Sequence, residues 1–371
     1  MLSAALDVFR LRQYFDVVTR ARQWADGIRE DAGLLADVRR ALLPLPFDRP
    51  HPTERQPFPP FERLKAPWLE GRRLAVVATG GSGALASVVG VGRALEEADI
   101  RPAVWSLCSG SSLFGFPLAA GIPAAEVADF VLGFTSADYV DVDWRDLATL
   151  VPKRAKGFAG LLVGERIEHT YRRLVGQMTL GDLPVPAYAP IWNIEENRVE
   201  YIGPTTHPDL QVARAVHMAI ALPLFVSPVE LDGGYWCDGG IVDIFPVNPV
   251  LDLEEPSDVA LAVNGFYPPE FEGEDAKGWQ ERPGSILYVA SQVRTCQQAE
   301  LARVNLRRLR NSVDTLMIEP VPYEKVKGAG FYRQFLNQTE WPQFMRAGRE
   351  AARSALRRAE DHGPVMGSPH K

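Results

Sequence analysis

Three short segments of this chain carry groups that could take part in acyl transfer. The first, Thr79 to Gly83, reads TGGSG, and the second, Leu107 to Ser112, reads LCSGSS and contains Ser109. The third, Asp238 to Val242, reads DGGIV. A serine hydroxyl becomes a strong nucleophile when a neighbouring base accepts its proton. A glycine-rich turn can present backbone N–H groups to the oxyanion that this attack creates.

Each segment also has a simpler explanation when it is taken alone. A glycine-rich turn between a strand and a helix binds a phosphate as readily as an oxyanion. A Ser-Gly turn after a strand serves as a helix N-cap, and Asp-Gly-Gly forms an ordinary turn. The order of the three segments along the chain is therefore as informative as their residue types.

Short apolar runs predict the strands that position these segments. LAVVAT over 74–79 ends at the glycine-rich turn, AVWSLC over 103–108 ends at Ser109, and VALAVN over 259–264 is a third run. Residues 84–98 are expected to form a helix between the first two strands, and the apolar helix LFGFPLAAG follows the serine turn. Buried strands that alternate with helices predict an α/β fold with a mostly parallel sheet.

The two ends of the chain differ from this pattern. Helical spacing of apolar residues predicts helices over residues 1–42, as an extra layer or as an amphipathic stretch that touches a membrane. Eight prolines between 44 and 67 predict an extended strap. Helices are expected over 291–311 and 341–359, with a strand over 313–320 between them. We therefore divide the chain into a helical extension and strap (1–70), an α/β hydrolase domain (71–360) and a flexible tail (361–371).

Taken together, the three segments resemble the patatin-like phospholipase family. The family has a helix ending in a sequence like R-A-L-E-E-A-G-I, and Arg93 to Ile100 reads RALEEADI here. The family serine follows that segment by nine residues and precedes an A-G pair by twelve, which selects Ser109 over Ser111 and Ser112. Residues 215–247 also resemble the family stretch that contains D-G-G-x-V, and the resemblance covers roughly 72–358.

The resemblance implies a three-layer α/β/α fold and a lipid acyl hydrolase of the phospholipase A, lysophospholipase or carboxylesterase type. Ser109 would be the nucleophile and Asp238 the base, in a dyad without a histidine, cofactor or metal. The oxyanion would be stabilised at Gly80, Gly81, Ser82, Gly83 and Gly110. We expect an acyl-chain groove to be lined by Phe114, Phe116 and Phe225.

The chain departs from the family pattern at two places. Ala84 stands where the family has Arg or Lys, and the elbow L-C-S-G-S replaces both glycines of G-x-S-x-G. These changes keep three alternatives in view: a catalytically impaired protein that binds acyl lipids or acts as a scaffold, an esterase for an intracellular polyester or small acyl ester, and a nucleotide-binding loop. For a nucleotide-binding loop, the glycine-rich segment lacks the Lys-Ser/Thr of a phosphate loop.

Composition limits the partners and the compartment. The 371 residues have a formal net charge of −7 and a pI near 5.5, which argues against nucleic acid as a partner. Three scattered cysteines indicate a reducing compartment, and no apolar run is long enough for a transmembrane helix. We expect a cytoplasmic protein that binds an acyl lipid substrate and contacts a membrane or lipid body peripherally. Because neighbouring strand residues point to opposite faces, the thiols of Cys108 and Cys237 should point into the core.

Overall fold

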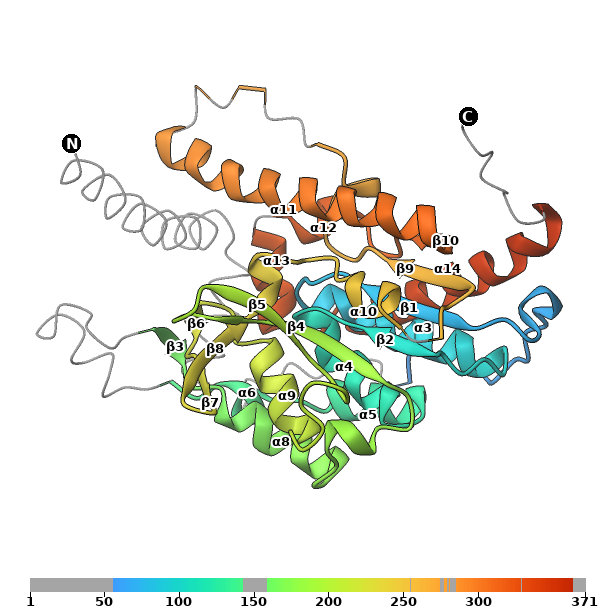
Figure 1. Ribbon diagram of the computed structural model, residues 1–371, viewed down its shortest axis with the longest axis horizontal. Helices are drawn as coiled ribbons and strands as arrows, with labels where there is room; N and C mark the ends of the chain where they lie inside the picture. Colours follow the sequence, from blue (N-terminus) through green and yellow to red (C-terminus); the bar gives the residue numbers. More distant parts are fainter. Residues whose placement is uncertain are drawn as a thin grey trace, which may run out of the picture.

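The computed structural model describes residues 56–142, 159–253, 255–273, 277–278, 280, 285–327 and 329–362 (Figure 1). The predicted helices over 1–42 and most of the predicted tail lie outside these residues, and so does the first part of the proline-rich strap. The part of the strap that is described, residues 56–66, has no regular secondary structure. No helix in the described ranges combines the length and the apolar character needed to cross a membrane.

A mixed sheet forms the centre of the molecule, with strand order β10-β9-β1-β2-β4-β8-β7 and β5 paired to β4. Its first five strands in this order are mutually parallel, whereas β5 and β8 run antiparallel to β4, and β7 antiparallel to β8. The strand bounds are β1 Leu74–Ala78, β2 Val104–Ser106, β4 Ala187–Asn193, β5 Arg198–Ile202, β7 Val229–Leu231, β8 Gly234–Asp238, β9 Val259–Val263 and β10 Asp314–Ile318. A separate pair joins β3 (Gly160–Leu162) to β6 (Leu224–Val226) in parallel.

Helices cover both faces of the sheet. On one face, residues of β1 such as Val76 pack with α3 (Ser87–Glu97), α4 (Gly110–Ala119), α5 (Ala124–Leu132) and α14 (Trp341–His362) in the larger core cluster. On the other face, Ala75 and Val77 pack with α10 (Asn248–Leu251) and α11 (Ser285–Ser312). Alternate strand residues therefore enter opposite cores, and the predicted α/β/α arrangement with a mostly parallel sheet is confirmed.

In Figure 1, α6, α8 and α9 are drawn in the lower part of the view near β7, whereas α12 is drawn in the upper part with α11. Residues of α8 and α9 also belong to the larger core cluster. Their bounds are α6 Ser136–Tyr139, α8 Glu165–Val175, α9 Val212–Ala219, α12 Tyr323–Val326 and α13 Ala329–Leu336.

A buried ionic cluster fixes the last long helix to the first. Glu97 at the end of α3 is fully buried, and its carboxylate accepts hydrogen bonds from Arg349 at 3.0 Å and from Arg353, both on α14. The described residues before β1 join this contact, because the N–H of Leu64 donates to the carbonyl of Glu97 at 2.7 Å. The ends of the described chain are thus packed together on one face of the sheet.

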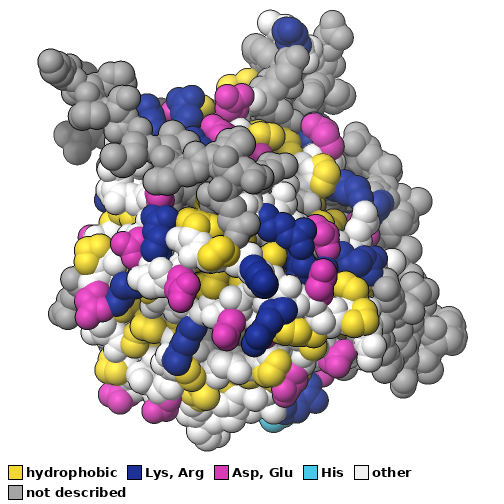
Figure 2. Space-filling model, turned by 90° about the vertical axis from the view of Figure 1, so that its right-hand side faces the viewer, with side chains coloured by type: hydrophobic (Ala, Val, Ile, Leu, Met, Phe, Trp, Pro, Cys, Tyr) yellow, Lys and Arg dark blue, Asp and Glu magenta, His cyan; other side chains and the backbone are white. Residues whose placement is uncertain are grey.

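The surface mixes charges of both signs. Figure 2 shows Lys and Arg side chains interspersed with Asp, Glu and apolar residues over the face that lies to the right in Figure 1.

Candidate active site

Ser109 lies on a strained turn between β2 and α4. Its backbone angles are φ 48° and ψ −121°, in a region that side chains other than glycine rarely adopt. A sharp strand-to-helix turn of this kind exposes the hydroxyl of a nucleophile elbow. Ser109 is the N-cap residue of α4, so the positive end of that helix also faces the turn.

The neighbouring serines have different surroundings. The Ser111 hydroxyl accepts a hydrogen bond from the N–H of Cys108 at 2.8 Å and donates to the carbonyl of Cys108 at 2.9 Å. Ser111 and Ser112 are both fully buried, whereas Ser109 is half-buried and lines a pocket. Ser111 therefore holds the turn closed, and the structure leaves Ser109 as the serine with access to the pocket. The sequence offered no signal for this role of Ser111 beyond its helix N-cap spacing.

Asp238 approaches Ser109 from the end of β8. It is 1% exposed, and its carboxylate accepts a hydrogen bond from the N–H of Gly240 at 2.8 Å. Burial raises the pKa of Asp238 to about 7, against the opposing effect of hydrogen bonds from the Ser109 hydroxyl and the Gly240 N–H. The Ser109 hydroxyl is therefore close enough to the Asp238 carboxylate to lower its pKa.

The glycine-rich loop packs directly against the elbow. A Cβ on Gly110 would lie 2.1 Å from the carbonyl oxygen of Gly81, so the two turns touch through their backbones. Gly81 itself has φ 155° and would place a Cβ 2.4 Å from Leu85. Glycine is required at both positions by close approach.

The predicted oxyanion residues are not equivalent. The N–H of Gly80 donates to the carbonyl of Ile244 at 2.9 Å and is therefore already used. Within the described chain, the N–H groups of Gly81, Ser82, Gly83 and Gly110 have no acceptor, and all four residues line the same pocket as Ser109. Gly80 has a packing role instead, since a Cβ there would lie 3.2 Å from that of Ser109.

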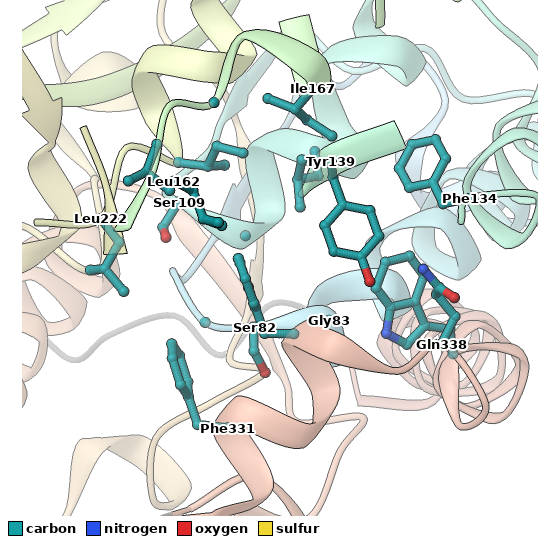
Figure 3. Close-up of a pocket in the computed structure, with 18 residues that line it drawn as sticks. Ser82, Gly83, Ser109, Phe134, Tyr139, Leu162, Ile167, Leu222, Phe331 and Gln338 are labelled. Carbon is teal, nitrogen blue, oxygen red and sulfur yellow. The ribbon is translucent and has the colours of Figure 1, made fainter. Parts of the chain in front are cut away.

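A mostly apolar pocket opens at Ser109 (Figure 3). Around the elbow and glycine-rich loop its described lining includes the apolar residues Leu113, Phe134, Leu162, Ile167, Ile220, Leu222, Val226, Phe331 and Phe335. Tyr139, Gly164, Gln338 and Trp341 complete it. The lining thus combines the segment after β2 with α6, α8, α13 and the start of α14.

The three predicted groove residues are placed elsewhere. Phe114 and Phe116 are fully buried in the larger core, and neither they nor Phe225 belong to the pocket lining. The two phenylalanines of α4 belong to the larger core, where Phe114 packs against Trp341, while Leu113 of the same helix lines the pocket. Leu113 therefore lines the pocket, where the sequence predicted Phe114 and Phe116.

The C-terminal part of the chain contributes to the pocket without any signal in the sequence motifs. A Cβ on Gly83 would lie 2.1 Å from both the carbonyl of Gln334 and Nε1 of Trp341. Trp341 also packs edge-on against Phe114, with ring centroids 5.3 Å apart. The glycine-rich loop therefore packs against residues that lie more than 250 positions further along the chain.

A second buried carboxylate lies behind the elbow. The carboxylate of Asp243 accepts hydrogen bonds from the Tyr201 hydroxyl and, at 3.1 Å, from Asn305 of α11. Burial raises the pKa of Asp243 to about 6. Asp243 does not line the pocket, and its carbonyl accepts a weak hydrogen bond from the Cys108 thiol at 3.5 Å. This network positions the backbone that carries Asp238.

Both thiols beside the candidate dyad are buried, as predicted. Cys108 is fully buried in the smaller core cluster, and Cys237 is 1% exposed. Burial raises the pKa of Cys108 well above its usual value and that of Cys237 to about 12, so both thiols stay protonated at neutral pH.

The one histidine close to the pocket lies behind its wall. His217 is buried beside Glu168, with Nδ1 3.3 Å from a carboxylate oxygen and Nε2 3.3 Å from the carbonyl of Val163. A Cβ on Gly164 would lie 2.1 Å from Nε2, so this imidazole packs against the wall and does not reach Ser109's side of it. Among the residues described, the lining of the pocket at Ser109 thus includes no histidine.

Comparison with known proteins agrees with this class of site. The family model described as patatin-like phospholipase matches residues 76–251, so the chain carries a patatin-like phospholipase domain in this region. That range contains the glycine-rich loop, Ser109 and Asp238.

Relatives and solved structures with partial likeness are also known. Uncharacterized NTE family proteins of Mycobacterium tuberculosis and Mycobacterium bovis are 29% identical over 109 residues, which is 29% of this chain and 28% of theirs. The matched stretch thus spans less than a third of these curated relatives. VipD from Legionella pneumophila is similar with a TM-score of 0.44 and 16% identity, over 77% of this chain and 67% of that one. Full-length ExoU of Pseudomonas aeruginosa, in complex with SpcU, has a TM-score of 0.38 and 15% identity, over 80% and 53%.

Proposed function

We propose that this protein hydrolyses carboxylic esters of acyl lipids through Ser109 and Asp238. The observation that supports the proposal is the place of Ser109, which lines an apolar pocket and lies beside the buried Asp238 carboxylate closely enough to lower its pKa. A phospholipid, lysophospholipid or simpler ester would present its acyl chain to this pocket and its carbonyl to the elbow.

The reaction would proceed in two steps. Asp238 accepts the proton of Ser109 as the hydroxyl oxygen attacks the ester carbonyl, and the proton passes to the leaving alkoxide as the acyl enzyme forms. Water then attacks the acyl enzyme as Asp238 takes its proton, and Asp238 returns that proton to the Ser109 oxygen as the acyl–serine bond breaks and the free acid leaves. Throughout, the N–H groups of Gly81, Ser82 and Gly110 are available to the oxyanion, and loss of one such donor typically costs about 10²–10³ in rate.

The missing basic residue at Ala84 does not remove these donors. Ala84 is fully buried within the larger core, where a cationic side chain would have no access to water. Oxyanion stabilisation in this protein would therefore depend on backbone N–H groups and the N-terminus of α4, without an added positive charge at that position.

The test is hydrolysis of p-nitrophenyl esters over a range of acyl chain lengths, together with labelling by a fluorophosphonate probe. We expect the wild type to turn over and label, Ser109→Ala to lose both, and Asp238→Asn to lose turnover. Ser111→Ala and Ser112→Ala serve as controls for the choice of serine, and Ser112→Ala should retain labelling. A folded wild type that neither labels nor turns over would instead favour a lipid-binding protein without catalysis.

A further inference from the structure

The pocket has a polar side chain in an otherwise apolar region. Gln338, in the segment between α13 and α14, lines the pocket and is 3% exposed. Figure 3 shows it on the side opposite Ser109, beside Phe134 and Tyr139. An amide is an unusual choice for a surface that would hold only methylene groups.

The amide of Gln338 has no hydrogen-bond partner within the described chain. Its backbone carbonyl accepts from the N–H of Trp341 at 3.0 Å, which fixes the residue in place. Two polar groups nearby are bonded within the protein: the Tyr139 hydroxyl donates to the carbonyl of Leu336 at 3.3 Å, and Nε1 of Trp341 donates to the carbonyl of Gln334 at 3.1 Å. An acyl chain that fills the pocket and displaces its water would leave the Gln338 amide unpaired, at a cost of about 1–3 kcal/mol, so the amide points to a polar group on the ligand.

We propose that the acyl group of the substrate carries a hydroxyl that bonds to Gln338. This inference rests on the proposed function, since it places the ester carbonyl at Ser109 and the acyl chain along the pocket. The amide offers both an N–H donor and a carbonyl acceptor, and a hydroxyl both accepts and donates. The substrate class is therefore an ester of a hydroxylated acyl chain, with an apolar stretch between the carbonyl and the hydroxyl.

Selectivity follows from the chemistry of the buried amide. An unsubstituted chain fills the apolar lining equally well but leaves Gln338 unpaired, whereas a hydroxylated chain pairs it. Sites built to bond a hydroxyl discriminate against the analogue that lacks it for this reason. A net gain of about 1 kcal/mol for a neutral hydrogen bond corresponds to a preference of roughly fivefold in kcat/KM.

The experiment compares p-nitrophenyl esters of one chain length, unsubstituted and with a hydroxyl moved stepwise along the chain. We expect one or two adjacent hydroxyl positions to raise kcat/KM at least roughly fivefold in the wild type. Gln338→Leu, which keeps the shape and removes the amide, should abolish this gain, and the readout is the ratio of kcat/KM for the hydroxylated ester to that for the unsubstituted ester. Gln343→Leu on the exposed side of α14 is the matched control and should keep the wild-type preference.

The outcomes separate this inference from the proposed function. If unsubstituted esters are cleaved but no hydroxyl position is preferred, or if the preference persists in Gln338→Leu, the hydroxyl inference is overturned and the esterase stands. If no ester is cleaved and the probe does not label a folded protein, both are overturned. Gln338→Met provides a second apolar variant should the leucine protein fail to fold.

Discussion

At the residue scale, the burial of Asp238 sets the expected pH dependence. A general base must be ionised, and burial raises the pKa of Asp238 to about 7. We expect kcat/KM on a p-nitrophenyl ester to fall by about tenfold per pH unit below this value and to level off above it. A pH–rate profile of the wild type measures this, and a profile that stays flat through the neutral range would exclude Asp238 as the titrating base.

The raised pKa of Asp238 also affects the stability of the fold, which we expect to fall as pH rises, whereas activity should rise. The folded protein holds this proton more tightly than the unfolded chain, so the stabilisation is complete below the unfolded pKa and is lost as pH rises through about 7. Asp238→Asn should therefore unfold at a higher temperature than the wild type above neutral pH, with a smaller difference near pH 5. Thermal unfolding of both proteins across pH tests this, and equal differences at all pH values would contradict it.

Contact between the two turns makes Gly110 the most sensitive small residue of the site. In Gly110→Ala the new Cβ would meet the Gly81 carbonyl at 2.1 Å and push the glycine-rich loop away from the elbow. We expect a folded protein whose kcat falls by about 10²–10³, the loss typical for one oxyanion donor. Gly273→Ala, where no atom lies within 4 Å, is the control and should keep full activity. Unchanged turnover in Gly110→Ala would show that these N–H groups do not stabilise the oxyanion.

At the element scale, the attachment of α14 to α3 depends on one buried carboxylate. Glu97→Gln removes the one fully buried carboxylate that Arg349 and Arg353 share and leaves these buried guanidinium groups only the exposed carboxylates of Glu62 and Glu350. Removal of one partner from a buried ion pair typically costs about 3–5 kcal/mol. Urea unfolding should detect this loss, whereas Glu300→Gln, which breaks the exposed pair with Arg303, should cost less than about 1 kcal/mol. Similar small losses in both variants would mean that the cluster contributes little to holding α14.

Local patterns predicted the elements near the chemistry better than those that complete the pocket. The strands ending at Thr79 and Ser109 are continuous apolar runs, and runs of this kind form buried parallel strands in almost any context. By contrast, β7 and β8 are short and half-exposed, and their antiparallel pairing with β4 depends on long-range contacts. No periodicity in the sequence carries that information.

The contrast between local sequence patterns and long-range contacts also explains why the predicted pocket lining differs from the observed one. The spacing of the motifs predicted Ser109 and Asp238 as candidate site residues, and the sequence also predicted that Phe114 and Phe116 line the groove. In the structure both phenylalanines of α4 are buried in the core. The actual wall includes Gln338 and Trp341, whose position follows from the packing of α14 on α3. Such tertiary contacts have no signature within a short stretch of sequence.

At the scale of the whole molecule, residues 1–70 precede the region that resembles the patatin-like family, and we hypothesise that they cover the groove. Removing residues 1–55 keeps the described anchor, since Leu64 and Leu69 both belong to the larger core. We expect the shortened protein to remain folded and to cleave soluble esters faster than the full chain. Unchanged activity in a folded shortened protein would count against a covering role.

The packing of Trp341 and Gln334 against Gly83 bears on when the protein becomes able to act during its synthesis. Translation of the first two-thirds of the chain already includes Ser109, Asp238 and the glycine-rich loop. This loop packs against residues around 334–341, which leave the ribosome later. Arg349 and Arg353, which bind the Glu97 carboxylate, are synthesised later still. A nascent chain stalled before this point would hold Ser109, Asp238 and the glycine-rich loop and still lack the part of the pocket wall that Gln338 and Trp341 form.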